Sequence, residues 1–312
     1  MGTTSTQPLY TILGAGGVIA NELTKTLIEN NKQVRLVSRS PKSVAGVTDL
    51  VAADLTDAAS VNNAVAGSSV VFLTAGLKYD IKVWKRDWPV IMTNVINACK
   101  NAGAKLIFFD NVYSYGLVEG PMTEETPYRP SSKKGEVRAA IATQLMNEVK
   151  AGNITAIIAR SADFYGPGAD KTGFLNILII DKFKKNSSAM WLGRDDKVHS
   201  YTYTPDAGKG LYLLSQDDAA WNQVWHLPTA NPAPDGKGYI DLIAKEMNVK
   251  PKYMKLGGFM LGLSGLFDTT IREMKEMLYQ NNYDYIFDSS KFEKHFNVRP
   301  TPYQEGIRAS VK

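Results

Sequence analysis

The sequence LYTILGAGGVIA, residues 9–20, decides the fold. It begins with the apolar run Leu9–Leu13, which is typical of a short buried strand. Glycines follow at once, and Val18–Asn30 then carries apolar side chains at helical spacing. A strand that passes through a glycine-rich turn into a helix is the opening of a βαβ unit. The stretch therefore predicts a parallel sheet whose first strand lies near the start of the chain.

The glycine turn has the composition of an anion-binding site. Gly14 allows a tight turn, and Gly16 or Gly17 lets the backbone approach a pyrophosphate without a Cβ in the way. The helix that follows directs its free N–H groups at the same place, which favours negative charge. We therefore expect a dinucleotide on this turn, in contact with Gly14, Gly16, Gly17, Val18 and Ile19. The alternative is a turn that opens a helix and binds nothing.

The end of the expected second strand bears on which dinucleotide binds. Sites that prefer NAD carry an acidic residue there, which binds the ribose 2′-hydroxyl. Here the residues are Ser38 and Arg39, with Lys42 close behind, and none is acidic. Arg39 can form a bidentate, charge-assisted contact with a 2′-phosphate. We therefore expect NADP rather than NAD, the alternative being that Arg39 is a solvated loop residue.

Strand-like and helix-like segments alternate through the first half of the chain. The expected strands are 9–13, 34–37, 50–53, 70–73, 106–109 and 155–159, and the expected helices are 18–30, 58–65, 83–101 and 132–151. The strands are almost wholly apolar, as parallel strands covered on both faces are. The pattern predicts an α/β protein with a Rossmann-type, doubly wound parallel sheet.

Two further groups of residues follow expected strands and belong to the predicted site. Ligands of such sheets bind at the carboxyl ends of the strands. Asp54 and Leu55 follow the third strand, so we expect them near the adenine. Thr74, Ala75 and Gly76 follow the fourth strand, so we expect them beside the ribose and phosphates of the cofactor.

The regular alternation ends after Arg160. Expected helices there are 174–185, 206–215, 239–247 and 259–278, and expected strands are 198–204 and 224–227. We expect two domains. The dinucleotide-binding domain comprises residues 1–165 with 199–228, and a smaller, mostly helical C-terminal substrate-binding domain comprises 166–198 with 229–312.

Composition excludes several classes of protein. The chain has 312 residues and a formal net charge of +5, with its lysines scattered and no basic stripe that nucleic-acid binding would need. No apolar run reaches the roughly 20 residues of a membrane span. The single cysteine, Cys99, excludes an internal disulfide, and the first residues lack a secretion signal, so we expect a cytoplasmic protein.

Several short motifs follow the glycine turn in a specific order. They are Ala53-Asp54-Leu55, Val112–Gly116 (VYSYG), Glu124–Pro127 (EETP), Arg160–Pro167 (RSADFYGP) and His199–Gly208. Together they resemble the extended short-chain dehydrogenase/reductase superfamily, in particular its NAD-dependent epimerase/dehydratase group, over nearly the whole chain. The resemblance implies that the RSADFYGP motif lies near the nicotinamide, so we expect Tyr165 on the cofactor side.

The sequence departs from that family at its catalytic positions. Members use a Ser or Thr, a Tyr, and a Lys four residues after the Tyr. If Tyr115 and Gly116 are aligned with the family's Tyr-Gly, Asn111 takes the place of the serine. The family's helix start matches residues 130–138, so that Lys134 takes the place of the tyrosine and Arg138 that of the lysine. The chain contains no Tyr-x-x-x-Lys. The resemblance therefore implies an atypical member.

The replacements are chemically coherent. Lys134 and Arg138 are four residues apart and share one helix face. Arg138 could hold a ribose or phosphate, and a lysine beside a second cation can serve as acid or base near neutrality. We expect catalysis by Lys134, with Asn111 orienting a carbonyl and Tyr113 as another proton donor. The alternative is a group of solvated charges, although basic residues at a helix start are unfavourable unless an anion is near.

Other polar and aromatic residues have more ordinary interpretations. We interpret Asp163 as a turn or capping residue and His226 as a hydrogen-bonded core histidine. The three histidines, His199 among them, are too dispersed for a metal pair, so we expect no metal. Trp84 and Trp88 fit a core or an interface better than a substrate platform.

The sequence thus predicts an NADP(H)-dependent oxidoreductase or epimerase/dehydratase-like enzyme. Its substrate would be a carbonyl or hydroxyl compound, with nucleotide sugars among the candidates. The alternative is a non-catalytic NADP(H) sensor of the same fold, because the usual catalytic pair is missing. The resemblance also implies a homodimer that forms through the helices 83–101 and 132–151.

Overall fold

The computed structural model describes residues 7–257, 273 and 275–312, and its centre is a parallel sheet. Seven strands follow the order β11-β7-β5-β4-β1-β2-β3. They are β1 (Leu9–Leu13), β2 (Gln33–Ser38), β3 (Asp49–Ala52), β4 (Val70–Leu73), β5 (Lys105–Asp110), β7 (Ala156–Arg160) and β11 (Val224–His226). The order runs outward from β1 in both directions, so the predicted doubly wound sheet is confirmed. Its strand order reverses between β1 and β4, where ligands of such sheets bind.

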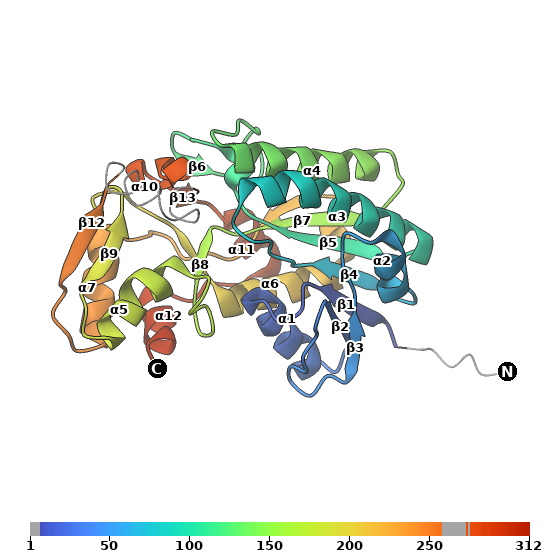
Figure 1. Cartoon of the computed structure of the whole chain (residues 1–312), viewed down its shortest axis with the longest axis horizontal. Coiled ribbons are helices and arrows are strands. Elements are labelled where there is room, and N and C mark those ends of the chain that lie inside the picture. The colour runs from blue at the N-terminus through green and yellow to red at the C-terminus, as the bar shows by residue number, and fades with distance from the viewer. Residues whose placement is uncertain (1–6, 258–272, 274) are drawn as a thin grey trace.

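Helices cover both faces of the sheet, which explains why its strands are so apolar (Figure 1). One face packs against α2 (Ala58–Val65), α3 (Ile81–Ala102) and α4 (Lys133–Lys150). The other face packs against α1 (Val18–Glu29) and α6 (Thr204–Gln216). Each layer encloses a core of aliphatic and aromatic side chains, and these cores hold the carboxyl ends of the strands in place.

A second lobe lies beside the sheet and has a core of its own (Figure 1). Its elements are a π-helical segment at Asn176–Ile180, α5 (Asp181–Lys184), β9 (Ala189–Leu192), α7 (Gly236–Glu246), β12 (Tyr253–Leu256) and α12 (Tyr303–Ser310). The strands β9 and β12 pair in parallel. This lobe draws on both segments assigned to the substrate-binding domain, and the domain boundaries themselves stay a prediction.

Short elements connect the lobe with the sheet. They are β6 (Pro121–Met122), β8 (Asp163–Tyr165), β10 (Tyr201–Tyr203), α10 (Tyr279–Asn282), β13 (Ile286–Phe287), α11 (Ser290–Phe296) and the 3-10 turns Tyr113–Tyr115 and Asp218–Ala220. The expectation that the chain rejoins the sheet from residue 199 is wrong for its first part. The strand β10 pairs with β8 in a sheet of two strands, and only β11 joins the main sheet.

The helices bear on two expectations from the sequence, the C-terminal helix and the absence of a membrane span. The helix expected at 259–278 falls largely outside the described residues, which resume at Glu273. Among the helices that the structure does describe, none combines the length and the apolar composition that crossing a membrane requires.

His226, in β11, is the hydrogen-bonded core histidine that the sequence predicts. Its Nδ1 donates to the carbonyl oxygen of Asp288 at 2.8 Å, because a carbonyl can only accept. Its Nε2 therefore accepts from the hydroxyl of Tyr115, also at 2.8 Å. The ring also stacks on Phe287. Burial lowers the pKa of His226 to about 3, so the folded protein keeps this side chain neutral.

The buried histidine makes stability depend on pH. In the unfolded chain the imidazole binds a proton near pH 6.5, whereas in the folded protein it does so only near pH 3. The contribution of His226 to the free energy of unfolding is therefore fully present above pH 6.5. It decreases as the pH falls below that value, by up to about 1.4 kcal/mol per pH unit. Urea unfolding at pH 7 and pH 5 checks this. His226→Gln should be less stable than the wild type at pH 7, but its free energy of unfolding should fall less between pH 7 and pH 5. An equal fall in both proteins would contradict the conclusion that His226 is buried in its neutral form.

Candidate functional site

A cavity of about 440 Å³ lies at the carboxyl ends of the central strands. Its wall combines segments that follow β1, β4, β5 and β7, side chains of α3 and α4, and part of the second lobe. The wall segments after the strands are 17–19, 74–77, 109–111 and 161–164. This is the edge of the sheet where the sequence predicts the cofactor, and the cavity includes the reversal of strand order between β1 and β4.

The glycine turn has the geometry that close approach of a ligand requires. Gly14 has a φ of +101°, and a Cβ there would lie 2.5 Å from the backbone of Ala75, so only glycine fits. Gly16 has a φ of +96°, and a Cβ there would meet nothing within 4 Å. The first residue of α1 follows Gly17, whose position offers no side-chain cap. The turn therefore presents bare backbone and a helix N-terminus to open space, which fits a pyrophosphate.

Some of the other residues predicted to bind the cofactor lie in the cavity wall, and others lie outside it. Val18 and Ile19 belong to the wall, as do Thr74, Ala75 and Gly76. The residues at the ends of β2 and β3 lie outside the wall; they are Ser38, Arg39, Asp54 and Leu55.

Arg39 and Asp54 lie near each other beyond the cavity. Hydrogen bonds from the backbone and hydroxyl of Thr56 lower the pKa of Asp54, and the charge of Arg39 lowers it further. Arg39 is exposed and forms no ion pair with any residue that the structure describes. Its guanidinium is thus available to a phosphate.

Asp110, at the end of β5, is the centre of a buried charge cluster. Its carboxylate accepts from Nε of Arg138 at 2.7 Å and from Nε of Arg160 at 3.2 Å. Arg160 also donates to the hydroxyl of Tyr128 at 2.6 Å. Asp110 and Arg138 line the cavity. Because one carboxylate faces two guanidiniums, the cluster is net positive, which suits an anionic cofactor.

Aromatic rings hold Arg138 against that carboxylate. Its guanidinium lies 4.4 Å from the ring centroid of Trp88 and 4.9 Å from that of Phe108. The sequence did not indicate this stacking, since Trp88 looked like ordinary core. Contact between Arg138 and the cofactor stays a prediction.

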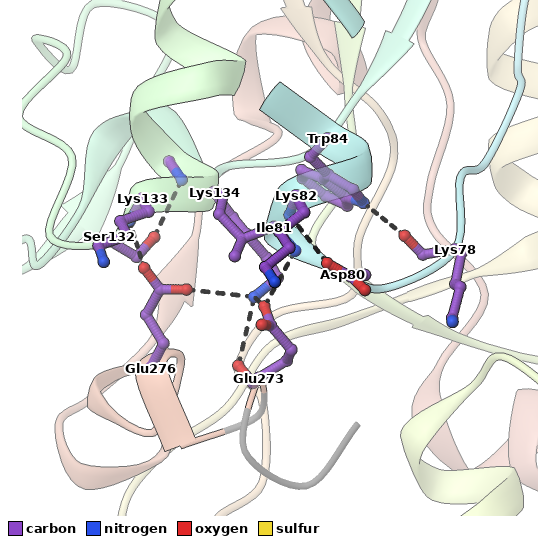
Figure 2. A network of polar contacts seen from close by, with 11 residues as sticks. Lys78, Asp80, Ile81, Lys82, Trp84, Ser132, Lys133, Lys134, Glu273 and Glu276 are labelled. Carbon is purple, nitrogen blue, oxygen red and sulfur yellow. Dashed lines mark hydrogen bonds and ion pairs between the residues drawn. The ribbon is translucent and has the colours of Figure 1, made fainter. Parts of the chain in front are cut away.

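Lys134, in the first turn of α4, lies in a second buried charge network (Figure 2). Its ammonium is fully enclosed and pairs with the carboxylates of Glu273 and Glu276, the latter at 3.1 Å. Glu273 also accepts from the backbone N–H of Ile81 at 3.2 Å, and Glu276 accepts from that of Lys133. The two carboxylates therefore join the starts of α3 and α4 to the 273–276 segment.

This network corrects one expectation about the catalytic positions. The anions near the basic start of α4 are two carboxylates of the chain itself. Lys134 and Arg138 each pair with carboxylates of their own, and their joint action in catalysis stays a prediction. Lys134 does not belong to the cavity wall, and its ammonium lies 4.6 Å from the ring centroid of Tyr79, which does. Catalysis by Lys134 stays a prediction.

Asn111 and Tyr113, the other two catalytic candidates, do belong to the cavity wall. The side-chain oxygen of Asn111 accepts from the backbone N–H of Tyr113 at 3.0 Å, which fixes the turn after β5. The ring of Tyr113 stacks on Trp84 with centroids 6.3 Å apart. Burial raises the pKa of Tyr113 well above its usual value, so its hydroxyl stays protonated and can donate a hydrogen bond.

Tyr165 lies elsewhere than expected. Its ring packs against Tyr203 and Tyr303 in the core of the second lobe, and it is absent from the cavity wall. Its side chain is almost fully buried in that core, which keeps it out of the cavity. The structure thus does not support Tyr165 as a cofactor contact.

Sequence reasoning placed Asp163 at a loop by the site, equally a turn or capping residue, and missed its pairing with His199. Asp163 lines the cavity, and its Oδ2 lies 3.0 Å from Nε2 of His199. Residues 36 positions apart carry no local signal of such a pair. The described residues contain no group of three or more His, Cys, Asp or Glu side chains that could hold a metal ion.

Comparison with known proteins agrees with this architecture. The family model of the NAD dependent epimerase/dehydratase family matches residues 10–225. The dTDP-glucose 4,6-dehydratase of Mycobacterium tuberculosis is 30% identical over 200 residues, which cover 56% of this chain and 60% of that protein. The enzyme of the same name from Mycolicibacterium smegmatis is 30% identical over 191 residues, 57% of each chain. The chain thus matches less than two thirds of the length of these relatives.

Solved structures share the fold over almost the whole chain. UDP-glucose 4-epimerase of Thermus thermophilus, in complex with NAD, superposes with a TM-score of 0.79 at 16% identity and covers 97% of both chains. UDP-glucose 4-epimerase of Thermotoga maritima, with UDP-glucose, gives a TM-score of 0.79 at 17% identity and the same coverage. With the family model matched across the glycine turn, the sheet and β11, the chain belongs to the NAD dependent epimerase/dehydratase family.

Proposed function

We propose that the chain is an NADP(H)-dependent oxidoreductase or epimerase/dehydratase-like enzyme with an atypical active site. The observation that carries this proposal is the cavity, which connects the glycine turn of α1 with the polar residues behind β5 and β7. The names of the relatives support the same chemistry, since the two dehydratases act on a nucleotide sugar and the Thermus epimerase binds NAD. A nucleotide sugar is therefore a candidate substrate, among other carbonyl and hydroxyl compounds.

The residues present fit a nicotinamide dinucleotide. Gly16 and the start of α1 would hold the pyrophosphate, because backbone and open space meet there. When bound, the nicotinamide accepts or donates a hydride. Trp84 and Trp88 wall off the cavity and limit access of water to the reacting atoms. In this proposal Asn111 orients the substrate carbonyl and Tyr113 donates a hydrogen bond to it.

The preference for NADP over NAD rests on Arg39, in the absence of an acidic residue at the end of β2. If Arg39 binds a 2′-phosphate, Arg39→Ala should weaken NADPH binding roughly tenfold and leave NADH binding unchanged, because a charge-assisted hydrogen bond contributes about 1.5–3 kcal/mol. Arg86→Ala, an exposed arginine on the outer face of α3, is the matched control. Fluorescence titration measures the affinity of the wild type and both variants for each cofactor. Tighter binding of NADH than NADPH to the wild type would contradict the preference.

The enzyme proposal is tested by turnover. Purified protein with NADPH is assayed against 9,10-phenanthrenequinone, and protein with NADP⁺ or NAD⁺ against UDP-glucose and dTDP-glucose. We expect oxidation or reduction of the cofactor, or conversion of the sugar, with at least one of these compounds. Failure of the protein to bind either reduced cofactor at millimolar concentration would overturn the whole proposal.

One observation favours a second candidate function. Lys134, at the family's catalytic tyrosine position, pairs with two carboxylates and lies outside the cavity wall. A chain that binds NADP(H) without turnover would be a sensor of the cofactor. In that case NADPH should change the oligomeric state or the binding of a protein partner, while every compound in the turnover assay stays unchanged.

The homodimer and the cytoplasmic location are part of the same proposal. The helices α3 and α4 lie side by side, which is the arrangement that the family resemblance assigns to the dimer (Figure 1). Their outer faces are mainly polar, with Val90 as the large exposed apolar residue among them. Light scattering of the purified chain tests the dimer, and cell fractionation tests the location.

A further inference from the structure

We propose that Asp163 is the proton-transferring residue of this cavity and that His199 is its positioning residue. The assignment rests on the proposed redox function and deepens it. It also gives the site an acid and base that does not depend on the family's missing tyrosine and lysine.

Asp163 stands where a reacting group can reach it. It begins β8, directly after the loop that leaves β7, and it lines the cavity together with Asn111 and Tyr113. Its side chain is 15% exposed, so the carboxylate is largely shielded from water and still accessible. A largely desolvated carboxylate of this kind suits proton transfer.

The buried ring of His199 holds the carboxylate of Asp163 in position. Its Nε2 lies 3.0 Å from Oδ2 of Asp163, and its side chain is 2% exposed. The ring stacks on Tyr285, with centroids 4.3 Å apart and planes 10° apart, and contacts Tyr201 with centroids 4.6 Å apart. Because the rings on both sides are buried, the imidazole cannot rotate without repacking them.

The hydrogen bonds determine which nitrogen of His199 carries its proton. A carboxylate can only accept, so Nε2 donates to Asp163. Nδ1 is buried and has no hydrogen-bond partner among the residues that the structure describes. A proton there would be an unpaired buried donor, so the neutral tautomer with Nε2–H is favoured. His199 therefore aims the carboxylate by donating to it, and Asp163 is the member of the pair that faces the cavity.

The other ionisable groups of the cavity wall are poorly suited to accept a proton. Asp110 is enclosed by two guanidiniums, one of them that of Arg138, which stays charged. Burial raises the pKa of both Tyr79 and Tyr113, so their phenolates are scarce near neutrality. Lys171 is an exposed ammonium, which only donates. The remaining carboxylate is therefore the base of this cavity.

Tyrosine side chains surround Asp163, and no lysine or arginine of the described residues forms an ion pair with it. His199 is the residue that pairs with it among the described side chains. Burial raises the pKa of Tyr201, Tyr279 and Tyr285, and the negative charge of Asp163 raises each further. These hydroxyls stay neutral and can surround the carboxylate without competing with it as bases.

The proton transfer accompanies hydride transfer to the nicotinamide. In the oxidative direction a bound nicotinamide would take up the hydride released as the substrate C–H bond breaks, and the carboxylate of Asp163 would accept the proton released as the substrate O–H bond breaks. The C–O single bond becomes a carbonyl. In the reductive direction the carboxylic acid of Asp163 returns the proton to the carbonyl oxygen as the hydride arrives at carbon.

The test compares Asp163 variants on the compound of the turnover assay that the wild type converts fastest. Asp163→Asn preserves the shape of the side chain and an acceptor for His199, so it should fold. We expect its kcat/KM to fall at least 100-fold, the size of a typical general-base contribution, and the pH profile of the remaining activity to differ from that of the wild type. NADPH affinity should stay within twofold. Asp241→Asn, which changes an exposed carboxylate on α7, should behave as the wild type.

Two more variants separate chemistry from structure. Sodium formate should restore activity to Asp163→Ala, because a small carboxylate can enter the space that the side chain leaves. His199→Gln keeps an N–H donor and should retain more activity than His199→Phe, which keeps only the ring. Both His199 variants should have a lower kcat and a nearly unchanged KM, since His199 acts through Asp163.

The outcomes distinguish this assignment from the proposed function. If the wild type binds NADPH and converts no compound, the proposed function fails and the assignment fails with it. If the wild type is active and Asp163→Asn keeps activity within threefold with an unchanged pH profile, the assignment alone is wrong. If formate does not restore activity to Asp163→Ala and Asp163→Asn binds NADPH more weakly, Asp163 has a structural role and not a catalytic one.

Discussion

Asp110→Ala is expected to lower the free energy of unfolding by about 3–5 kcal/mol, because it leaves two buried guanidiniums without their carboxylate. Arg138 and Arg160 are both enclosed, and each donates to Asp110. Neither can release its proton, since arginine stays charged in proteins. Their mutual repulsion and their lost solvation would then oppose folding, and no other acidic group of the described chain pairs with either of them.

Urea unfolding at pH 7 measures this effect. The control is Asp49→Ala, which removes the partly exposed partner of Arg35 and should cost less than about 1 kcal/mol. The double variant Asp110→Ala/Arg138→Met should recover part of the loss, because an apolar side chain of similar length then replaces one of the two unpaired charges. Equal stability of Asp110→Ala and the wild type would show that the cluster does not contribute to folding.

The same variant should also affect the cavity, because Asp110 and Arg138 belong to its wall. With the carboxylate gone, the guanidinium of Arg138 keeps its contacts with the rings of Trp84, Trp88 and Phe108 but loses its ion pair. The charge cluster thus connects the stability of the sheet edge with the shape of the site.

The central sheet could be predicted from the sequence because its signals are local. Each apolar run of four to six residues between turns became a strand of the sheet, and the glycine turn lies where its spacing placed it. The strands β6, β8 and β13 have only two or three residues, which is too short for any periodic pattern. Their partners, and the return of β10 to β8 instead of the main sheet, depend on packing of the second lobe.

The site was less predictable, because its decisive contacts join residues far apart in the chain. Lys134 and Glu273 are 139 positions apart, and His199 and Asp163 are 36 apart. Local reasoning did indicate that an anion should lie near the basic start of α4. It assigned that anion to the cofactor, because one sequence does not show which distant carboxylates reach the helix.

Lys134→Met is expected to lower the free energy of unfolding by about 3–5 kcal/mol, because Glu273 and Glu276 lose their shared cation. The effect should spread to the starts of α3 and α4, which Glu273 and Glu276 bind through Ile81 and Lys133. Thermal and urea unfolding measure the loss. Lys133→Met changes an exposed lysine at the next position and is the matched control.

A second substitution decides whether Lys134 is catalytic or structural. In Lys134→Met/Glu273→Gln the unpaired buried carboxylate becomes a neutral amide, which still accepts from Ile81, so stability should recover in part. If Lys134 transfers protons, the double variant regains stability while kcat stays at least 100-fold below that of the wild type. If Lys134 only joins the helices, kcat recovers together with stability. Since Lys134 lies outside the cavity wall and its ammonium pairs with Glu273 and Glu276, we expect the second result.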